Sequence, residues 1–101
     1  MKSLEQTIKD VERDLVINLV ISVKYKRISF AESKKIAKDF ISYFPFKDYE
    51  DLFERLYFLS NSYREVRKVY VKYSPAYYEE RSKAILEILR NNMKGKDYGK
   101  T

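Results

Sequence analysis

The stretch from Leu15 to Val23 is the feature of the sequence that most constrains the fold. It is nine residues long and is apolar except for Asn18 and Ser22. A membrane-spanning helix needs about 20 consecutive apolar residues, so this stretch is too short to cross a bilayer. It is also too apolar for an ordinary surface helix, whose apolar residues occupy a single stripe. We therefore expect a soluble protein in which this stretch is covered, either by its own chain or by another one.

The same stretch is rich in β-branched residues, a composition that also suits a strand. However, Leu4, Ile8 and Val11 lead into Leu15 at the three- and four-residue spacing of an amphipathic helix. No second segment of the chain has the pattern of a strand that could pair with this one. The spacing therefore predicts one long helix over residues 3–27.

Further helices are predicted from capping signals. In a capping box, a serine accepts a hydrogen bond from the third amide of the helix, and an acidic or amide side chain at that third position reaches back. A proline suits the first position of a helix, where no amide donor is needed. The matching sites are Ser3 with Gln6, Ser29 with Glu32, Asp48 with Asp51, Ser62 with Glu65, and Ser74 followed by Pro75. With the apolar spacing, they predict helices over 3–27, 30–44, 48–60, 63–73 and 75–93.

The whole chain fits one all-α domain. Its 101 residues are typical of a single domain, and the connections of about two to four residues place successive helices side by side. We expect a compact bundle of four to five helices over residues 1–93. Residues 94–101 contain both glycines and three lysines, so we expect a flexible basic C-terminal tail.

The sequence offers little for catalysis. It contains no histidine and no cysteine, so the commonest general base and the thiolate metal ligands are missing. Its two glycines lie near the end, and no glycine-rich phosphate loop can form in the body. Asp10 with Asp14 and Glu50 with Glu54 lie one turn apart, a spacing that is routine on a solvated helix face. We predict a non-enzyme with no cofactor, no metal site and no small-molecule substrate.

The composition also bears on location and source. Acidic residues precede the apolar stretch, whereas a secretory signal begins with basic ones. The lack of cysteine fits a reducing compartment, so we expect a cytoplasmic protein that does not associate with membranes. Charged residues make up 36% of the chain, and this content resembles that of thermophile proteins.

Two arrangements can cover the apolar first helix. It can be the central helix, wrapped by the other four, or part of its surface can be covered by a second copy of the chain. Under the second arrangement, Leu15, Leu19 and Val23 would anchor self-association. A coiled-coil-like seam of alternating four- and three-residue spacing supports it, with Asn18 and Ser22 setting the register: Leu4, Ile8, Val11, Leu15, Asn18, Ser22 and Tyr25. The two arrangements do not exclude each other.

The basic and aromatic residues form the second candidate surface. The net charge is +6 and the isoelectric point is about 9.4. Segment 24–47 has seven basic and two acidic residues, net +5, and segment 66–101 has nine against four, also net +5. Tyrosines beside lysines and arginines suit base stacking and phosphate binding, protein interfaces, or simple packing with the hydroxyl in water. The candidate partner surface is Lys34, Lys35, Lys38, Arg64, Arg67, Lys68, Tyr70, Lys72 and Tyr73.

These features lead to two functional hypotheses. The first is a non-catalytic module for protein–protein interaction or assembly, which self-associates through its apolar first helix. The second is a nucleic-acid-binding protein that recognises phosphates without reading sequence. A helix-turn-helix reading of duplex DNA is disfavoured, because the third helix carries Asp48, Glu50 and Asp51, which phosphates would repel.

Overall fold

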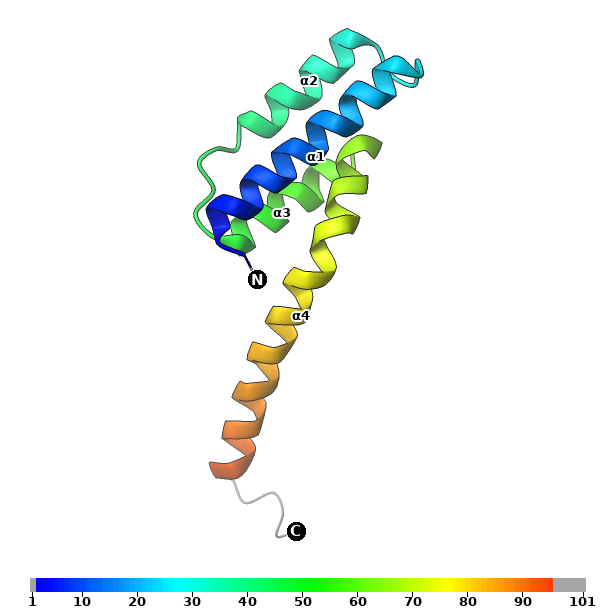
Figure 1. The fold of residues 1–101 in the computed structure, drawn as a ribbon. Helices are drawn as coiled ribbons and strands as arrows, with labels where there is room; N and C mark the ends of the chain where they lie inside the picture. The colour runs from blue at the N-terminus through cyan, green and yellow to red at the C-terminus, as the bar shows by residue number, and fades with distance from the viewer. Residues whose placement is uncertain (1, 96–101) are drawn as a thin grey trace.

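Four α-helices make up the described part of the chain in a computed structural model (Figure 1). The structure describes residues 2–95, with side chains to residue 92. The helices are α1 (Leu4–Lys24), α2 (Phe30–Ile41), α3 (Tyr49–Ser60) and α4 (Arg64–Gly95). Within these residues there is no strand, so the all-α class is confirmed. The apolar stretch 15–23 lies inside α1, and its prediction as a helix is confirmed as well.

Three of the predicted helix starts are confirmed by their hydrogen bonds. Ser29 accepts from the amide of Glu32 and the Glu32 side chain accepts from the Ser29 amide, which completes the capping box of α2. Ser3 caps α1 by accepting from the amide of Gln6. Asp48 caps α3 by accepting from the amide of Asp51. These bonds satisfy amide donors that have no partner inside the helix.

The prediction of two separate helices over 63–73 and 75–93 is wrong, because α4 runs without a break through Pro75. A proline inside a helix removes one amide donor and crowds the carbonyl four residues earlier. Tertiary packing overrides that cost here. Val69 and Ser74 before the proline and Tyr77 after it are all buried in the body of the protein, so both sides of Pro75 are held against the same neighbours.

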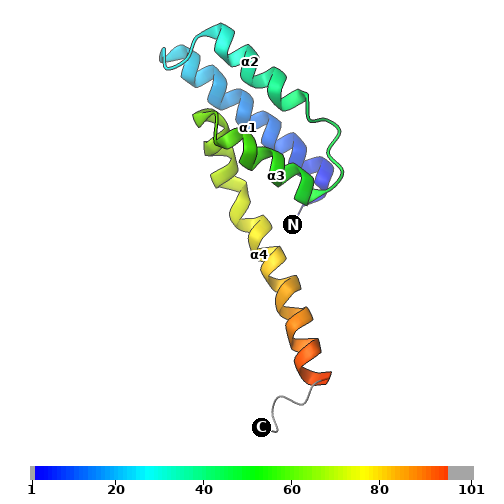
Figure 2. The same ribbon diagram turned by 180° about the vertical axis from the view of Figure 1, so that it is seen from behind.

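The helices surround one apolar core. In the view of Figure 1, α1 lies between α2 and α4, and α3 lies behind α1, as the view from behind in Figure 2 shows. The helices α1 and α2 run in opposite directions (Figures 1 and 2). Each helix contributes apolar residues at helical spacing, and the linker before α3 adds one more aromatic ring. The buried apolar residues are Val11, Leu15, Leu19, Ile36, Phe40, Phe46, Leu52, Phe53, Leu56, Leu59, Val66, Val69 and Tyr77.

The second half of α4 leaves this bundle. Its last described contact with another helix is the ion pair between Arg81 and Glu50 of α3, with 2.9 Å between Nη2 and Oε2. Every side chain from Tyr78 to Asn92 is exposed. We call residues 82–92 the projecting segment. It makes the protein 64 Å long against 24 and 19 Å in the other two directions (Figure 1), so the expectation of a compact bundle holds only for the rest of the chain.

Two further expectations concern the ends and the membrane. Of the predicted flexible tail 94–101, residues 94 and 95 belong to α4 and residues 96–101 lie outside the described part. Among the described residues, none of the helices combines the length and the apolar content that a membrane crossing requires.

Candidate protein-binding groove on helices α1 and α2

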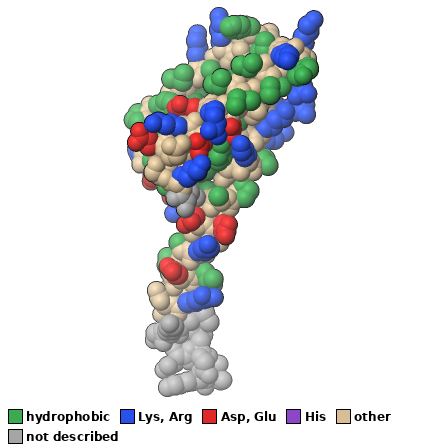
Figure 3. Space-filling model, viewed as in Figure 1, with side chains coloured by type: hydrophobic (Ala, Val, Ile, Leu, Met, Phe, Trp, Pro, Cys, Tyr) green, Lys and Arg blue, Asp and Glu red, His purple; other side chains and the backbone are tan. Residues whose placement is uncertain are grey.

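One face of α1 is left uncovered by its own chain. Val16, Ile17, Val20 and Ile21 are between 40% and 61% exposed, although α1 lies in the middle of the bundle. The first expected arrangement, a central helix wrapped on every side, is therefore incorrect. Figure 3 shows these helices from the front, with hydrophobic side chains gathered over α1 and α2.

Two adjoining hollows form a groove between α1 and α2 on the side of this face that carries Val16 and Val20, whereas Ile17 and Ile21 line neither hollow. The first has a volume of about 320 Å³ and the second about 250 Å³. The first is lined by Val16, Leu19, Val20, Val23, Phe30, Ser33, Lys34 and Ala37. The second is lined by Glu12, Leu15, Val16, Leu19, Ala37, Phe40, Ile41 and Phe44. Since Val16, Leu19 and Ala37 belong to both, the hollows form one continuous apolar groove.

The two hollows repeat with helical spacing. From one to the other, the lining residues shift by four positions in α1 and by seven in α2. At a rise of 1.5 Å per residue, these shifts correspond to about 6 and 10 Å. Side chains four or seven residues apart on one face of a helix have the same separation. The two hollows therefore repeat with the turns of the helices that line them.

All three predicted anchors lie in this groove. Leu15 and Leu19 are buried and form its floor, and Val23 is half-buried at the end of the first hollow. The sequence analysis missed the second wall of the groove, which consists of Phe30, Ala37 and Ile41 of α2 and of Phe44 just after the helix. Their spacing of seven, four and three residues marks a second apolar face of α2 beside the buried one, and this signal could have found them.

The predicted polar seam of α1 faces inward. Ser22 is buried, and its hydroxyl donates to Oε2 of Glu65 at 3.0 Å. The side-chain amide of Asn18 donates to the backbone carbonyl of Glu65 at 3.4 Å. Both residues therefore fix α4 against α1 inside a single chain, and the expectation that they set the register between two copies is wrong. It also follows that Glu65 serves this contact rather than a capping box with Ser62.

Several residues of the predicted basic and aromatic surface hold α4 in place. The Tyr73 hydroxyl and the Lys72 ammonium both donate to Oδ2 of Asp14, the latter at 2.7 Å. Arg67 donates to the backbone carbonyl of Ser60 at 3.3 Å. Burial and the bond to Asp14 raise the pKa of Tyr73 to about 12, so its hydroxyl remains a donor at neutral pH. Stacking on a base would require these contacts to open.

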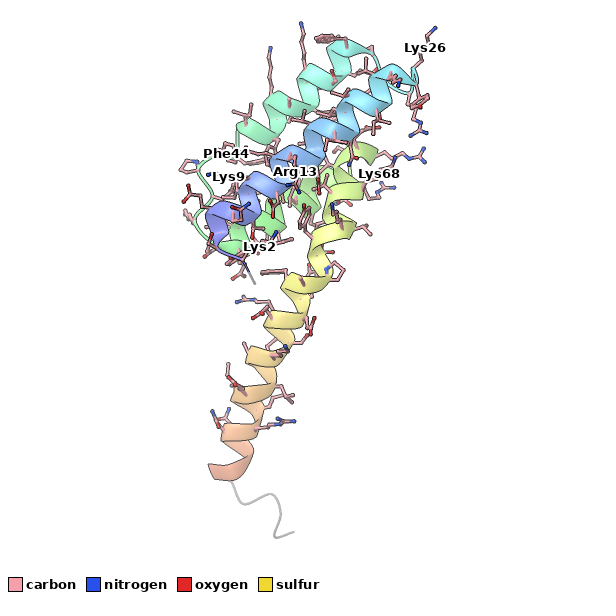
Figure 4. The ribbon with its side chains drawn as sticks, viewed as in Figure 1. Lys2, Lys9, Arg13, Lys26, Phe44 and Lys68 are labelled. Atoms are coloured by element: carbon pink, nitrogen blue, oxygen red, sulfur yellow. The ribbon has the colours of Figure 1, made fainter. Side chains whose placement is uncertain are left out.

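The other members of that surface fall into two separate groups, one on α4 and one on α2. Tyr70 is half-buried with its hydroxyl 2.8 Å from that of Tyr78, whereas Arg64 and Lys68 are exposed on α4. Lys34, Lys35 and Lys38 are exposed on α2, on the other side of α1. Figure 3 shows Lys and Arg side chains at the upper and right-hand edges, with the apolar surface between them, and Figure 4 places Lys68 on α4 below Lys26. The structure thus brings the basic residues to the rims of the apolar groove face.

The paired carboxylates of α1 are engaged in ion pairs. Hydrogen bonds from Lys2 and Gln6 lower the pKa of Asp10, and hydrogen bonds from Lys72 and Tyr73 lower the pKa of Asp14. Both carboxyls are therefore ionised at neutral pH, and neither is suited to donate a proton as a general acid. Within the described residues, no group of three or more acidic side chains is arranged to hold a metal ion.

The fold and the groove define an all-helical protein with an open apolar groove on one face and a projecting amphipathic helix. No protein-family model, curated protein or solved structure matches the chain.

Proposed function

We propose that this protein is a non-catalytic assembly module that self-associates through the apolar face of α1 and α2. The observation that carries the proposal is the groove itself, which is continuous over both helices and bordered by exposed apolar side chains. A contiguous apolar patch with polar rims is typical of protein-binding sites, whereas isolated exposed apolar residues are not. Leu15, Leu19 and Val23 would anchor the partner from the floor and end of the groove.

Simple energetics favour an interface larger than α1 alone. The four exposed residues of α1 are each about half exposed, so covering each would contribute on the order of 1 kcal/mol. Association itself costs about 4–15 kcal/mol in lost translational and rotational freedom. A stable complex therefore also needs the second wall, with Phe30 and Ile41 of α2 and Phe44 after it, and an apolar surface on the partner that fills both hollows.

Sedimentation velocity over a wide concentration range tests the proposal. We expect a monomer at low concentration that becomes a dimer as the concentration rises. Val20→Lys should abolish this dimer, because it places a charge on the groove wall. Val71→Lys is a matched control, since Val20 and Val71 are both 61% exposed and Val71 lies on α4 outside the groove. A chain that stays monomeric at millimolar concentration would contradict self-association.

Nucleic-acid binding is the second candidate, and the observation in its favour is the Lys and Arg along the rims (Figure 3). The residues to test are Lys34, Lys35 and Lys38 on α2 with Arg64 and Lys68 on α4. Each phosphate that such a residue neutralises contributes about −0.7 to −0.9 to the slope of log affinity against log salt. We expect a steep salt dependence with single-stranded RNA or DNA, weakened by Lys68→Gln. Affinity that does not change with salt would contradict this candidate.

A further inference from the structure

We propose that the groove is filled by the projecting segment of a second copy, so that two copies of the chain exchange these segments. The inference rests on the proposed self-association and names the surface that meets the groove. Every chain carries both halves of the contact: an open apolar groove on α1 and α2, and an amphipathic helix that leaves its own bundle.

The projecting segment is apolar on one side. Ile85, Ile88 and Leu89 are 58%, 60% and 53% exposed, and their three- and four-residue spacing places them on one face of α4. Lys83 and Glu87 lie on the opposite side. A helix with this pattern is stabilised mainly by packing of its apolar face. Within the described part of the chain, all side chains of the segment are exposed, so another chain is the natural source of that packing.

The dimensions of the segment match those of the groove. The α1 wall of the groove from Glu12 to Val23 spans about 17 Å, or about three helical turns, and α4 continues from residue 82 to Gly95, which is long enough to lie along it. Ile85 and Leu89 lie about 6 Å apart along the helix axis, a separation that agrees with the four-residue shift between the two hollows. One helix face can therefore place an apolar side chain in each hollow.

An exchange between two copies fixes the direction of the segment in the groove. Within one chain, α4 runs roughly antiparallel to α1 and carries the segment beyond the end of the bundle (Figures 1 and 2). A two-fold axis along α4 would leave both segments beyond both bundles, so an exchange requires an axis that crosses α4. The segment then runs parallel to α1 of its partner, from the second hollow to the first.

A mutual exchange also accounts for both exposed surfaces at once. In a two-fold symmetric dimer, each contact occurs twice, so the segment of one copy enters the groove of its partner and the reverse. Both grooves and both segments are then covered. A different protein bound in the groove would leave the projecting segment exposed in each copy.

Cross-linking between differently labelled chains tests the exchange, and the absence of cysteine from the chain makes it straightforward. One chain carries Ser82→Cys at the start of the segment. The other carries Ser33→Cys in the first hollow or Ile41→Cys in the second, positions about 12 Å apart along α2. A bismaleimide with a reach of about one and a half helical turns should join Ser82→Cys to Ile41→Cys in mixed samples, and should not join it to Ser33→Cys.

A second measurement uses the dimer dissociation constant. Ile88→Asp should raise the dimer dissociation constant by roughly tenfold or more, because it replaces a central apolar anchor with a charge. Val71→Asp, on the same helix and similarly exposed, should leave the dissociation constant unchanged. Circular dichroism of each variant verifies that the helices remain folded.

The possible outcomes separate this inference from the proposed function. An unchanged dimer in Ile88→Asp, a cross-link of Ser82→Cys to Ser33→Cys instead of Ile41→Cys, or cross-linking only between two Ser82→Cys chains would overturn the exchange. In those cases self-association itself would stand. A monomer at every concentration of the unaltered chain would overturn both.

Discussion

The body of the protein and the projecting segment use the same kinds of residues with opposite results. In α3, Leu52 and Leu56 are fully buried. In the projecting segment, Ile85 and Leu89 have similar size and the same four-residue spacing, yet more than half of each side chain is exposed. The amphipathic pattern therefore identifies a helix and its apolar face, but it does not reveal whether the neighbour that covers the face belongs to the same chain.

The difference arises from the lengths of the helices. α3 has 12 residues and α4 has 32, which correspond to about 18 and 48 Å. α4 packs against α1 and α3 over its first half, and then it extends beyond both (Figure 1). The excess length is what leaves Ile85 and its neighbours without cover.

The largest effect should come from the body. Leu56→Ala removes a fully buried side chain from the middle of the core, so we expect the free energy of unfolding to fall by about 2–5 kcal/mol through lost burial and the cavity left behind. Urea unfolding followed by circular dichroism measures this loss. Leu89→Ala is the control, and at concentrations where the chain is monomeric it should change the stability by less than about 0.5 kcal/mol. Equal losses in the two variants would contradict the division into body and segment.

A smaller effect is expected from the polar contact that ties α4 to α1. Ser22→Ala deletes the hydroxyl that donates to the Glu65 carboxylate, and both residues are buried. Loss of a donor to a buried charged acceptor costs about 1–3 kcal/mol. Ser42→Ala is a suitable control, because the Ser42 hydroxyl bonds a backbone carbonyl at an exposed position. If both variants unfold at the same urea concentration, the Ser22–Glu65 contact contributes nothing to stability.

The contact between Asp14 and α4 should be weaker and should depend on pH. Asp14→Asn weakens the bonds to Lys72 and Tyr73, so we expect a loss of about 1–2 kcal/mol at neutral pH. These bonds lower the pKa of Asp14 in the folded state. Their contribution is therefore complete above the unfolded-state pKa of about 4 and is lost as the pH falls through the lower folded-state pKa.

Unfolding of both chains between pH 7 and pH 2 measures this dependence. The stability difference between the unaltered chain and Asp14→Asn should shrink as the pH is lowered. A difference that stays constant over the whole range would show that the ionised carboxylate is not what holds α4 at this point.

Much of the fold could be predicted from the sequence, because the signals involved are local. The capping bonds of Ser29 and Asp48 involve residues three positions apart, and the apolar spacing that helped predict the helix over 48–60 is equally local. Pro75 was misread for the same reason. Its local effect is to end a helix, but the burial of Val69 and Tyr77 on either side depends on α1 and α3, which the local sequence does not contain.

The candidate groove was predicted only in part, and the reason is again non-local. The apolar stretch 15–23 of α1 indicated that another surface must cover it, and Leu15, Leu19 and Val23 do line the groove. Which side of α1 stays open depends on where α4 packs. That position is set by Glu65 and Asp14, which contact residues 43 to 59 positions away in the chain. Sequence spacing within one helix carries no information about such pairs.

The smallest effect on the body should come from deleting the segment altogether. A chain that ends after Ser82 keeps the Arg81–Glu50 ion pair and every residue of the apolar core. Of the deleted residues 83–101, those whose side chains the structure describes, Lys83 to Asn92, are all exposed, so we expect the free energy of unfolding of the monomer to change by less than about 0.5 kcal/mol. The same deletion should abolish the dimer, because it removes Ile85, Ile88 and Leu89 from the proposed contact. Unfolding at low concentration and sedimentation at high concentration, made on one sample, separate the two effects. A shortened chain that unfolds much more easily as a monomer would mean that the segment belongs to the body after all.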